Sequence, residues 1–429
     1  MSNLTDKFVT LLCSIEAGDI PERVWRQASR CLKDYVAVAV AGSRYFHDKE
    51  LALLRHAAKG DALVIGHDIH TDHLTAALVN GMSAHVVELD DGHRRGAVHV
   101  GATVFSALIS VAHEEKLSLR DVLYGAIVGY EATIRLACAV QPGNKLRGYH
   151  ATGTCGTLGA TMAVCAALHM DAVQTKSALS AAVASAAGVL EMQEDNSDMK
   201  PLNVGRAAMD AVAAAYIGKA GFAAPLDAIG GRRGFLRVMT DDPHPEYLTS
   251  HSEDYLIEQI YMKSYAACRH AHPAIEAALK LHSRFEAVDK VVSVTVETYH
   301  LAVAGHDHTD IEGVSSAKMS IPFGVALALY QGKAGVDVYD EEHVGNPLIL
   351  ALAKKVNVVE NDELSLLCPA RRAAIVTLRT ENGEWSERVD YPKGEPENPL
   401  SDEELDAKYN ELVGDDHELA NHVMHLSNT

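Results

Sequence analysis

The sequence predicts a mainly α-helical fold, in which a large all-helical domain is followed by a smaller α+β lid domain. Apolar residues recur at helical spacing up to about residue 221, and no strand-like alternation interrupts them. After about residue 285, apolar and polar residues alternate instead, which is the period of a half-buried strand. Hydrophobic residues make up 48% of the chain but aromatic residues only 6%, so Ala, Val, Leu and Ile must build the core.

The chain is too long for one ordinary domain at 429 residues. We expect the helical domain over residues 1–244 and the α+β lid domain over residues 245–395. Ser401 and Glu404 have the spacing of a capping box at the start of a final helix. The segment 396–429 that contains this helix is expected to return to the helical domain and complete it.

Segments rich in Ala, Gly and Ser predict the helices of the first domain in order. In residues 102–116, the side chains of Val104, Leu108 and Val111 fall on one helical face. Residues 151–168 are apolar enough to compare with a membrane span, but their Thr, Gly and Cys content favours a buried helix. The other segments with this pattern are 117–140, 157–170, 176–192 and 206–221, the last of which ends at Gly221 as a C-cap.

Strand patterns define the second half of the chain. Val292, Val294 and Val296 alternate with polar residues, which predicts a half-buried strand. Further along, two strand-like runs flank Asn382-Gly383, a dipeptide that accepts the positive φ angles of a type I′ turn. The sequence therefore predicts a β-hairpin there.

Charge and cysteine content narrow the class of function. The formal net charge of −20 argues against nucleic acid or an anionic membrane surface as a partner, and an anionic substrate would need local cations. Seven scattered cysteines without a CxxC pair predict neither a disulfide framework nor a zinc knuckle. The amphipathic start of the chain carries acids early, unlike a secretory signal. We expect a cytoplasmic protein.

Cofactor motifs are weak or missing in the sequence. There is no P-loop, HExxH or EF-hand pattern, and the glycines of GTCGTLG at 153–159 follow no predicted strand. His67, His70 and His73 have a spacing that could bind a metal, but a polar surface loop explains them better. We expect neither a cofactor nor a metal.

The stretch ELDDGHRRGAVHVGA at 88–102 concentrates ionisable groups inside an apolar region. It contains the acid/base groups Asp90, Asp91, His93 and His99 and the cations Arg94 and Arg95. These residue types can transfer protons and hold anions. A solvated loop between two helices explains the same stretch equally well.

Two further positions could contribute to a site. His150 stands at the start of an apolar helix, where the helix N-terminus favours an anion and lowers the pKa of an imidazole. Lys200 precedes Pro201, and Arg206 follows near the start of the next helix. Taken alone, a histidine that only caps or packs explains His150 at least as well, and a lysine in the position of Lys200 is usually solvated.

Basic residues also gather where the second domain begins. Lys263, Arg269, His270 and His272 precede an apolar helix. An arginine can bind a carboxylate through two parallel hydrogen bonds, so this segment could grip an acidic substrate. The alternative is the exposed entrance of a surface helix.

Four ordered motifs together resemble the MmgE/PrpD family, which includes 2-methylcitrate dehydratase, cis-aconitate decarboxylase and iminodisuccinate epimerase. The motifs are VNGMSAHVVELDDGHRRGAVHVGA, RGYHATGTCGTLGATMAVCAAL, MKPLNVGRAA with GFAAPLDAIGGRRGFL, and KSYAACRHAHPAIEA. The resemblance implies a helical domain, an α+β lid, a homodimer, and a site between the domains that needs neither cofactor nor metal. It also implies small di- or tricarboxylic acid substrates.

The resemblance and the residue types together give a candidate site. The expected catalytic residues are Asp91, His99, His150, Lys200 and Lys263, and the expected substrate-binding residues are His93, Arg206, Arg269 and His272. Three positions depart from the family pattern. Glu88 stands where an aspartate is common, Gly92 where a threonine is common, and Val100 where a proline is common. These departures bear on the reaction and substrate more than on the fold.

The expected activity is that of a cofactor-independent dehydratase similar to 2-methylcitrate dehydratase. Removing water next to a carboxylate needs a base, an acid and cations that hold the carboxylates. An epimerase, an isomerase or a decarboxylase of a related polycarboxylate would need similar groups and stays open. A non-catalytic binder of small acids is disfavoured, because His150, Lys200, Lys263 and Arg269 are all present.

Overall fold

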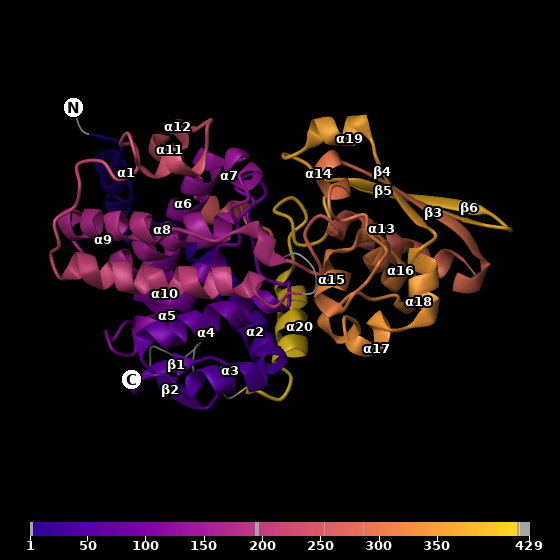
Figure 1. The fold of residues 1–429 in the computed structure, drawn as a ribbon, viewed down its shortest axis with the longest axis horizontal. Coiled ribbons are helices and arrows are strands. Elements are labelled where there is room, and N and C mark those ends of the chain that lie inside the picture. The colour runs from indigo at the N-terminus through magenta and orange to yellow at the C-terminus, as the bar shows by residue number, and fades with distance from the viewer. Residues whose placement is uncertain (1–2, 194–196, 253, 286, 418–419, 421–429) are drawn as a thin grey trace.

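The structure is a computed structural model and describes residues 3–193, 197–252, 254–285, 287–417 and 420. It has two lobes along its longest axis (Figure 1). The larger lobe is built from helices of the first half of the chain, and the smaller lobe holds a sheet covered by helices. The predicted fold class, mainly α with a smaller α+β domain, is confirmed.

Helices of the first lobe surround a few long central ones. The elements are α1 (Leu4–Cys13), α2 (Glu22–Tyr45), α3 (His47–Leu54), β1 (Ala62–Val64), β2 (Ile69–Thr71), α4 (His73–Val86), α5 (Gly101–Ala112), α6 (Leu119–Val140), α7 (Gly143–Leu146), α8 (Ala151–Ala167), α9 (Ala172–Ser185), α10 (Lys200–Lys219), α11 (Phe235–Met239) and α12 (Glu246–Thr249). The segment 151–168 is a buried helix, as predicted. The helix predicted over 206–221 starts earlier, at Lys200, and Gly221 follows its end with φ +80°.

Small residues allow the central helices to pack closely. A Cβ at Gly81 of α4 would lie 2.7 Å from the Cα of Gly205 in α10, and a Cβ at Gly125 of α6 would lie 2.7 Å from the carbonyl oxygen of Ala163 in α8. Neither contact leaves room for a larger side chain. Among the described residues, α6 is the helix that is long and apolar enough to cross a membrane, but 94% of its most apolar window is buried. It is therefore the core helix of this lobe.

A two-stranded hairpin interrupts the helical lobe, which the sequence pattern did not predict. Strands β1 and β2 pair antiparallel over only three residues each, too few for alternation to be visible. The surface-loop interpretation of the three histidines there is wrong for His67, which is buried with Nε2 2.8 Å from Glu50 Oε2. His73 contacts a different carboxylate, Glu114, so the imidazoles of His67 and His73 do not form one shared metal site.

The second lobe is built around a mixed four-stranded sheet. Its elements are α13 (His272–Leu281), β3 (Val291–Thr298), α14 (His300–Val303), α15 (Val314–Met319), α16 (Ile321–Gln331), α17 (Glu341–Val344), α18 (Pro347–Ala353), β4 (Val356–Glu360), α19 (Asp362–Leu367), β5 (Ala374–Thr380) and β6 (Glu384–Val389). The strand order is β4-β3-β5-β6, with β3 parallel to β4 and antiparallel to β5. Helices α13 and α16 pack against the sheet.

Both strand predictions are confirmed with one correction each. Val294 and Val296 are buried, but Val292 is 43% exposed because the register of β3 shifts between Val291 and Ser293. The hairpin joins β5 to β6, yet neither Asn382 nor Gly383 adopts a positive φ angle, so the type I′ turn is wrong.

Helix α20 (Asp402–Val413) returns to the first lobe and packs along α2. The predicted capping box is confirmed, since Ser401 and Glu404 exchange hydrogen bonds with each other's backbone. Lys408 donates to Asp34 of α2 at 2.7 Å and also to the carbonyl oxygens of Leu89 and Lys263. The last helix therefore braces the acid-rich stretch against the start of the second lobe. Residues 418–419 and 421–429 of the predicted segment lie outside the described residues.

Candidate active site

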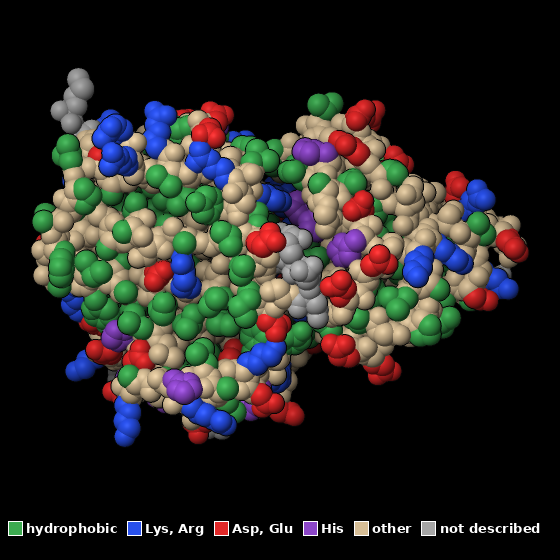
Figure 2. Space-filling view, viewed as in Figure 1, with side chains coloured by type: hydrophobic (Ala, Val, Ile, Leu, Met, Phe, Trp, Pro, Cys, Tyr) green, Lys and Arg blue, Asp and Glu red, His purple; other side chains and the backbone are tan. Residues whose placement is uncertain are grey.

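A cavity of about 630 Å³ lies between the two lobes and is lined by residues of both. In the space-filling view, Lys, Arg and His side chains are visible in the hollow between the lobes (Figure 2). Six Lys or Arg side chains line it, namely Arg94, Arg95, Lys145, Lys200, Arg269 and Arg372. Glu88 is the one carboxylate among the described lining residues. The cavity thus has local cations in a chain whose net charge is −20.

The acid-rich stretch connects α4 to α5 and is pinned to the second lobe. Gly92 exchanges two backbone hydrogen bonds with Tyr261, at 3.0 and 2.9 Å. A Cβ at Gly92 would lie 2.6 Å from the Tyr261 ring and 2.9 Å from the carbonyl oxygen of Val98. The departure from the family pattern at Gly92 therefore has a steric reason, which is the close approach of Tyr261.

Asp91 caps the following helix and does not line the cavity. Its Oδ1 accepts hydrogen bonds from the backbone N–H groups of Val100 and Gly101, at 3.2 and 2.8 Å, and Tyr130 donates to Oδ2. Burial raises the pKa of Asp91 to about 6, although these hydrogen bonds oppose the shift. Its carbonyl oxygen lies 2.8 Å from Nδ1 of His99. Its place behind His99 suits it to positioning that ring.

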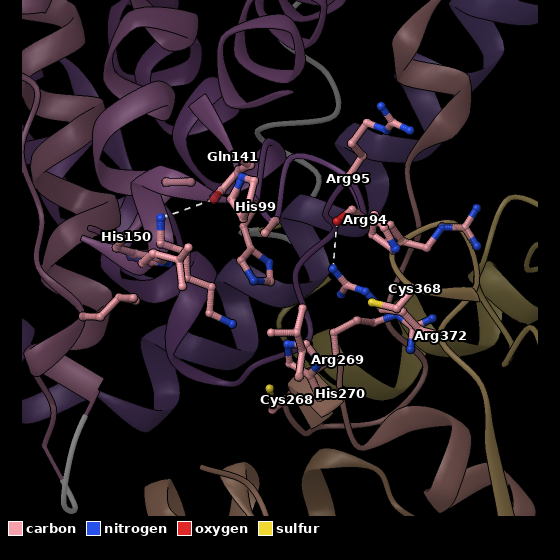
Figure 3. Close-up of a pocket in the computed structure, with 18 of the residues that line it drawn as sticks. Arg94, Arg95, His99, Gln141, His150, Cys268, Arg269, His270, Cys368 and Arg372 are labelled. Atoms are coloured by element: carbon pink, nitrogen blue, oxygen red, sulfur yellow. Dashed lines mark hydrogen bonds between the residues drawn. The ribbon is translucent and has the colours of Figure 1, made fainter. Parts of the chain in front are cut away.

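His99 belongs to a cluster with His85 and Asp90. Asp90 Oδ2 lies 2.7 Å from Nδ1 of His85 and 3.2 Å from Nδ1 of His99. Burial alone would raise the pKa of Asp90, but its interactions with His85, His99 and Lys263 hold it well below its usual range. His99 lines the cavity, and its Nδ1 is engaged with Asp90 and Asp91, so Nε2 is the nitrogen left for a substrate (Figure 3). His85 was not identified from the sequence.

His150 is the residue immediately before α8, as predicted, and it lines the cavity with only 7% of its surface exposed. Its Nδ1 is buried without a hydrogen-bond partner among the described residues. Burial, followed by the charges of His85 and Lys200, holds the pKa of His150 well below its usual range. The predicted direction is therefore right, although burial rather than the helix N-terminus is the main cause.

Glu88 links the two lysines of the predicted site. Its two carboxylate oxygens contact Lys200 Nζ and, at 2.9 Å, Lys263 Nζ. Burial would raise the pKa of Glu88, but the two ammonium groups hold it well below its usual range. Lys200 opens α10 and lines the cavity, whereas Lys263 is 1% exposed and lies behind Glu88. From the sequence, Glu88 was identified only as a position that differs from the aspartate common in the family, and its contact with both lysines was not predicted.

Three arginines from segments distant in sequence also line the cavity, namely Arg94, Arg269 and Arg372. Glu395 is buried and pairs with both Arg94, at 3.1 Å, and Arg269. Arg372 donates a hydrogen bond of 2.7 Å to the carbonyl oxygen of Arg94 (Figure 3). Arg372 and Lys145 were missed in the sequence. Arg372 lies far from the recognised motifs, whereas Lys145 lies two residues before the motif that begins at Arg147, and both reach the cavity through the fold.

Three residues predicted to contact substrate do not line the cavity. His93 is buried and accepts a hydrogen bond from the backbone N–H of Gly96, and burial lowers its pKa to about 4. Arg206 donates to the carbonyl oxygen of Ser185. His272 is fully buried, with Nε2 3.1 Å from the carbonyl oxygen of Ala267. Their positions favour structural roles over the substrate contact predicted for them.

His85, Asp90 and His99 are a possible set of metal ligands, because one ligand atom of each lies within 4.8 Å of the others. Nδ1 of His85 is 2.7 Å from Asp90 Oδ2, a hydrogen-bond distance that leaves no room for an ion between them. The ammonium of Lys263 lies 3.7 Å from Asp90 Oδ1 and already supplies a positive charge. The geometry fits a hydrogen-bonded cluster better than a metal site.

Comparison with known proteins agrees with the resemblance in the motifs. The family model of the MmgE/PrpD N-terminal domain matches residues 6–248, and that of the C-terminal domain matches residues 265–423. A cis-aconitate decarboxylase-like protein of Aspergillus oryzae is 25% identical over 96% of this chain and 90% of its own length. The human cis-aconitate decarboxylase is 23% identical over 95% of this chain and 87% of its own length. The chain therefore belongs to the MmgE/PrpD family and is an enzyme of the lyase type.

Proposed function

We propose that this chain is a cofactor-independent dehydratase that removes water from a small hydroxy di- or tricarboxylic acid, similar to 2-methylcitrate dehydratase. The observation that carries the proposal is that two imidazoles, His99 and His150, line one cation-rich cavity, where burial holds the pKa of His150 well below its usual range. Enzymes that need both an acid and a base often hold two titratable groups in contrasting environments. Dehydration needs both roles in one step.

Substrate binding is the first task of the cavity. Six Lys or Arg side chains face one carboxylate, so the local field attracts anions although the whole chain is acidic. Arg269 is partly stripped of water, which strengthens its attraction for a carboxylate. Its planar guanidinium can donate two parallel hydrogen bonds to that carboxylate. Two or three carboxylates on one small molecule would be held in a fixed orientation.

Proton transfer is the second task. His150 is neutral at neutral pH because burial lowers its pKa, so it can accept the proton from the carbon next to a carboxylate. Nδ1 of His99 lies 3.2 Å from Asp90 Oδ2, which leaves Nε2 for the substrate, and this nitrogen is the proposed donor of a proton to the departing hydroxyl. The electrons of the broken C–H bond form the new C=C bond as water leaves. Lys200 can stabilise the charge that develops on the adjacent carboxylate.

Decarboxylation is the second candidate, because the relatives that match over most of the chain are cis-aconitate decarboxylases. Loss of carbon dioxide leaves a carbanion that needs only a proton donor, and His99 could supply it. Epimerisation would use His99 and His150 as a proton donor and acceptor on either side of one carbon.

The homodimer and the cytoplasmic location stay predictions of the sequence.

Proton NMR in D₂O with EDTA tests the proposed reaction. We expect a new vinyl signal when the purified protein is offered a panel of citrate-like and malate-like hydroxy acids, and we expect EDTA to leave the rate unchanged. Deuterium incorporation after loss of carbon dioxide from an aconitate-like acid would replace dehydration with decarboxylation. Deuterium next to a carboxylate without net product would indicate epimerisation. No change with any acid would contradict all three.

A further inference from the structure

A thiol that none of these steps uses lies on the cavity wall. Cys268 precedes α13, lines the cavity and is partly exposed to it. Its Sγ is 3.9 Å from Nε2 of His306, which also lines the cavity. Nδ1 of His306 lies 3.0 Å from the carbonyl oxygen of Met319, so Nδ1 carries a hydrogen and Nε2 faces the sulfur. The backbone N–H of Cys268 donates to the carbonyl oxygen of Lys318, which fixes the segment.

The charges around Cys268 favour its thiolate. Burial alone would raise the pKa of this thiol, but His306 and then Lys200 lower it to about 6, with Glu88 opposing them. Lys145 and Tyr299 also interact electrostatically with Cys268, and the ring of His270 stacks on His306 at 5.1 Å. The thiolate and His306 therefore form a nucleophile and acid/base pair.

The other cysteines on this cavity have no such environment. Burial raises the pKa of Cys138 to about 12, and burial also raises the pKa of Cys368. Cys368 lies near Arg372 and Lys145 rather than against an imidazole (Figure 3). Cys368 is half-buried on the same cavity, as Cys268 is, so it serves as an internal control.

Two buried polar groups on the wall of this cavity favour an anionic ligand, although Arg269, one of them, also pairs with Glu395 through Nη2. Arg269 is 4% exposed, and its Nη1 makes no hydrogen bond among the described residues. His150 Nδ1 is likewise buried without a partner. A carboxylate held by Arg269 would place the rest of a small acid next to the sulfur of the preceding residue.

We propose that Cys268 is a covalent modification site for small carboxylate-bearing electrophiles, with α,β-unsaturated acids as the natural class. The choice of this class rests on the proposed function, because dehydration of a hydroxy acid produces such an acid in this cavity. The thiolate itself is independent of that reaction, since it follows from the contact with His306.

The addition balances without an oxidant or a cofactor. The sulfur attacks the carbon β to the carboxylate, and the electrons of the C=C bond move to the α carbon and its carboxylate. The proton lost by the thiol, held by His306, then returns to the α carbon. The product is a thioether that carries the whole acid, so the protein gains the full mass of the acid.

Alkylation of the wild-type protein at pH 6 tests the nucleophile. A free thiol with a pKa of about 8.5 is roughly 0.3% ionised at this pH, whereas Cys268 would be about half ionised. A thiolate of lower pKa is a weaker nucleophile by about tenfold here, which leaves a net advantage of roughly tenfold. Because burial raises the pKa of Cys368, we expect iodoacetate to label Cys268 at least tenfold faster than Cys368 by peptide mass mapping. Equal rates at the two cysteines would overturn the proposal.

The charge of the reagent tests the anion site. Iodoacetate should label Cys268 faster than neutral iodoacetamide does. At the exposed Cys13, iodoacetate should have no such advantage in rate. The His306→Gln variant should lose about tenfold in labelling rate at Cys268 and keep the wild-type melting temperature. The Cys368→Ser variant should label at Cys268 like the wild type. No preference for iodoacetate, or an unchanged rate in folded His306→Gln, would contradict the pairing.

Fumarate then tests the class of electrophile. We expect intact-mass spectrometry to show one added fumarate that maps to Cys268 and is missing in the Cys268→Ser variant. If iodoacetate labels Cys268 selectively and fumarate does not, the unsaturated-acid assignment is overturned and the nucleophile stands. The labelling experiments do not depend on turnover. A failure of the proposed dehydration would therefore be detected by the NMR panel alone and would leave the labelling result unaffected.

Discussion

Replacing His150 by glutamine is expected to lower kcat by two to four orders of magnitude, the usual contribution of a general base, at about 10²–10⁴-fold. The neutral imidazole on the cavity wall is the proposed proton acceptor, and glutamine cannot take a proton at neutral pH. The fold should tolerate the change, because Nδ1 of His150 makes no hydrogen bond among the described residues. Steady-state kinetics on the acid identified by NMR measures the effect.

The His56→Gln variant is the matched control, because His56 is exposed and does not line the cavity. It should keep the wild-type kcat. Circular dichroism should show both variants folded with similar melting temperatures. A folded His150→Gln protein with more than about a tenth of the wild-type kcat would exclude His150 as the base, since the expected loss is at least 10²-fold.

Replacing Glu88 by glutamine is expected to lower the free energy of unfolding by about 3–5 kcal/mol, the usual cost of leaving a buried charge unpaired. Glu88 is the carboxylate that contacts both Lys200 and Lys263, and Lys263 is 1% exposed. Asp90 lies 3.7 Å from Lys263 and compensates only in part. Urea unfolding at pH 7 measures the change.

The loss should depend on pH in a defined direction. The pKa of Glu88 is held well below its usual range in the folded protein. Its stabilisation is therefore present above the unfolded pKa of about 4.3 and is lost as the pH falls toward the folded value. The Asp337→Asn variant removes an exposed ion pair with Lys333 and should leave the free energy of unfolding almost unchanged. A Glu88→Gln loss no larger than this control would contradict the role of Glu88.

Local patterns predicted much of the fold because they depend on neighbours in sequence. The capping box of Ser401 and Glu404, the buried helix over 151–168 and the hairpin around Asn382 all follow from such patterns. The β1–β2 hairpin was not predicted, because strands of three residues are too short to show periodicity. The exposure of Val292 follows from a register shift that depends on the partner strand.

The site was predictable only where its residues lie in motifs. His99, His150, Lys200 and Arg269 were found this way, and the structure brings them to one cavity. Arg372, and the contact of His306 with Cys268, depend on the packing of segments distant in sequence. His93, Arg206 and His272 lie in or near the same motifs but face away from the cavity, because a motif does not specify which side chains point inward.

The central claim is that the cationic side chains of the cavity between the lobes bind a small polycarboxylate. Calorimetric titration with propane-1,2,3-tricarboxylate tests this claim most directly. This acid carries three carboxylates and no hydroxyl group that can leave. We predict one site per chain, with an affinity that weakens by about tenfold as ionic strength rises from about 0.05 M to 0.5 M, because salt screens partly exposed charges. We also predict no binding of the neutral tricarboxamide. No binding of the acid, or equal binding of acid and amide, would contradict the account.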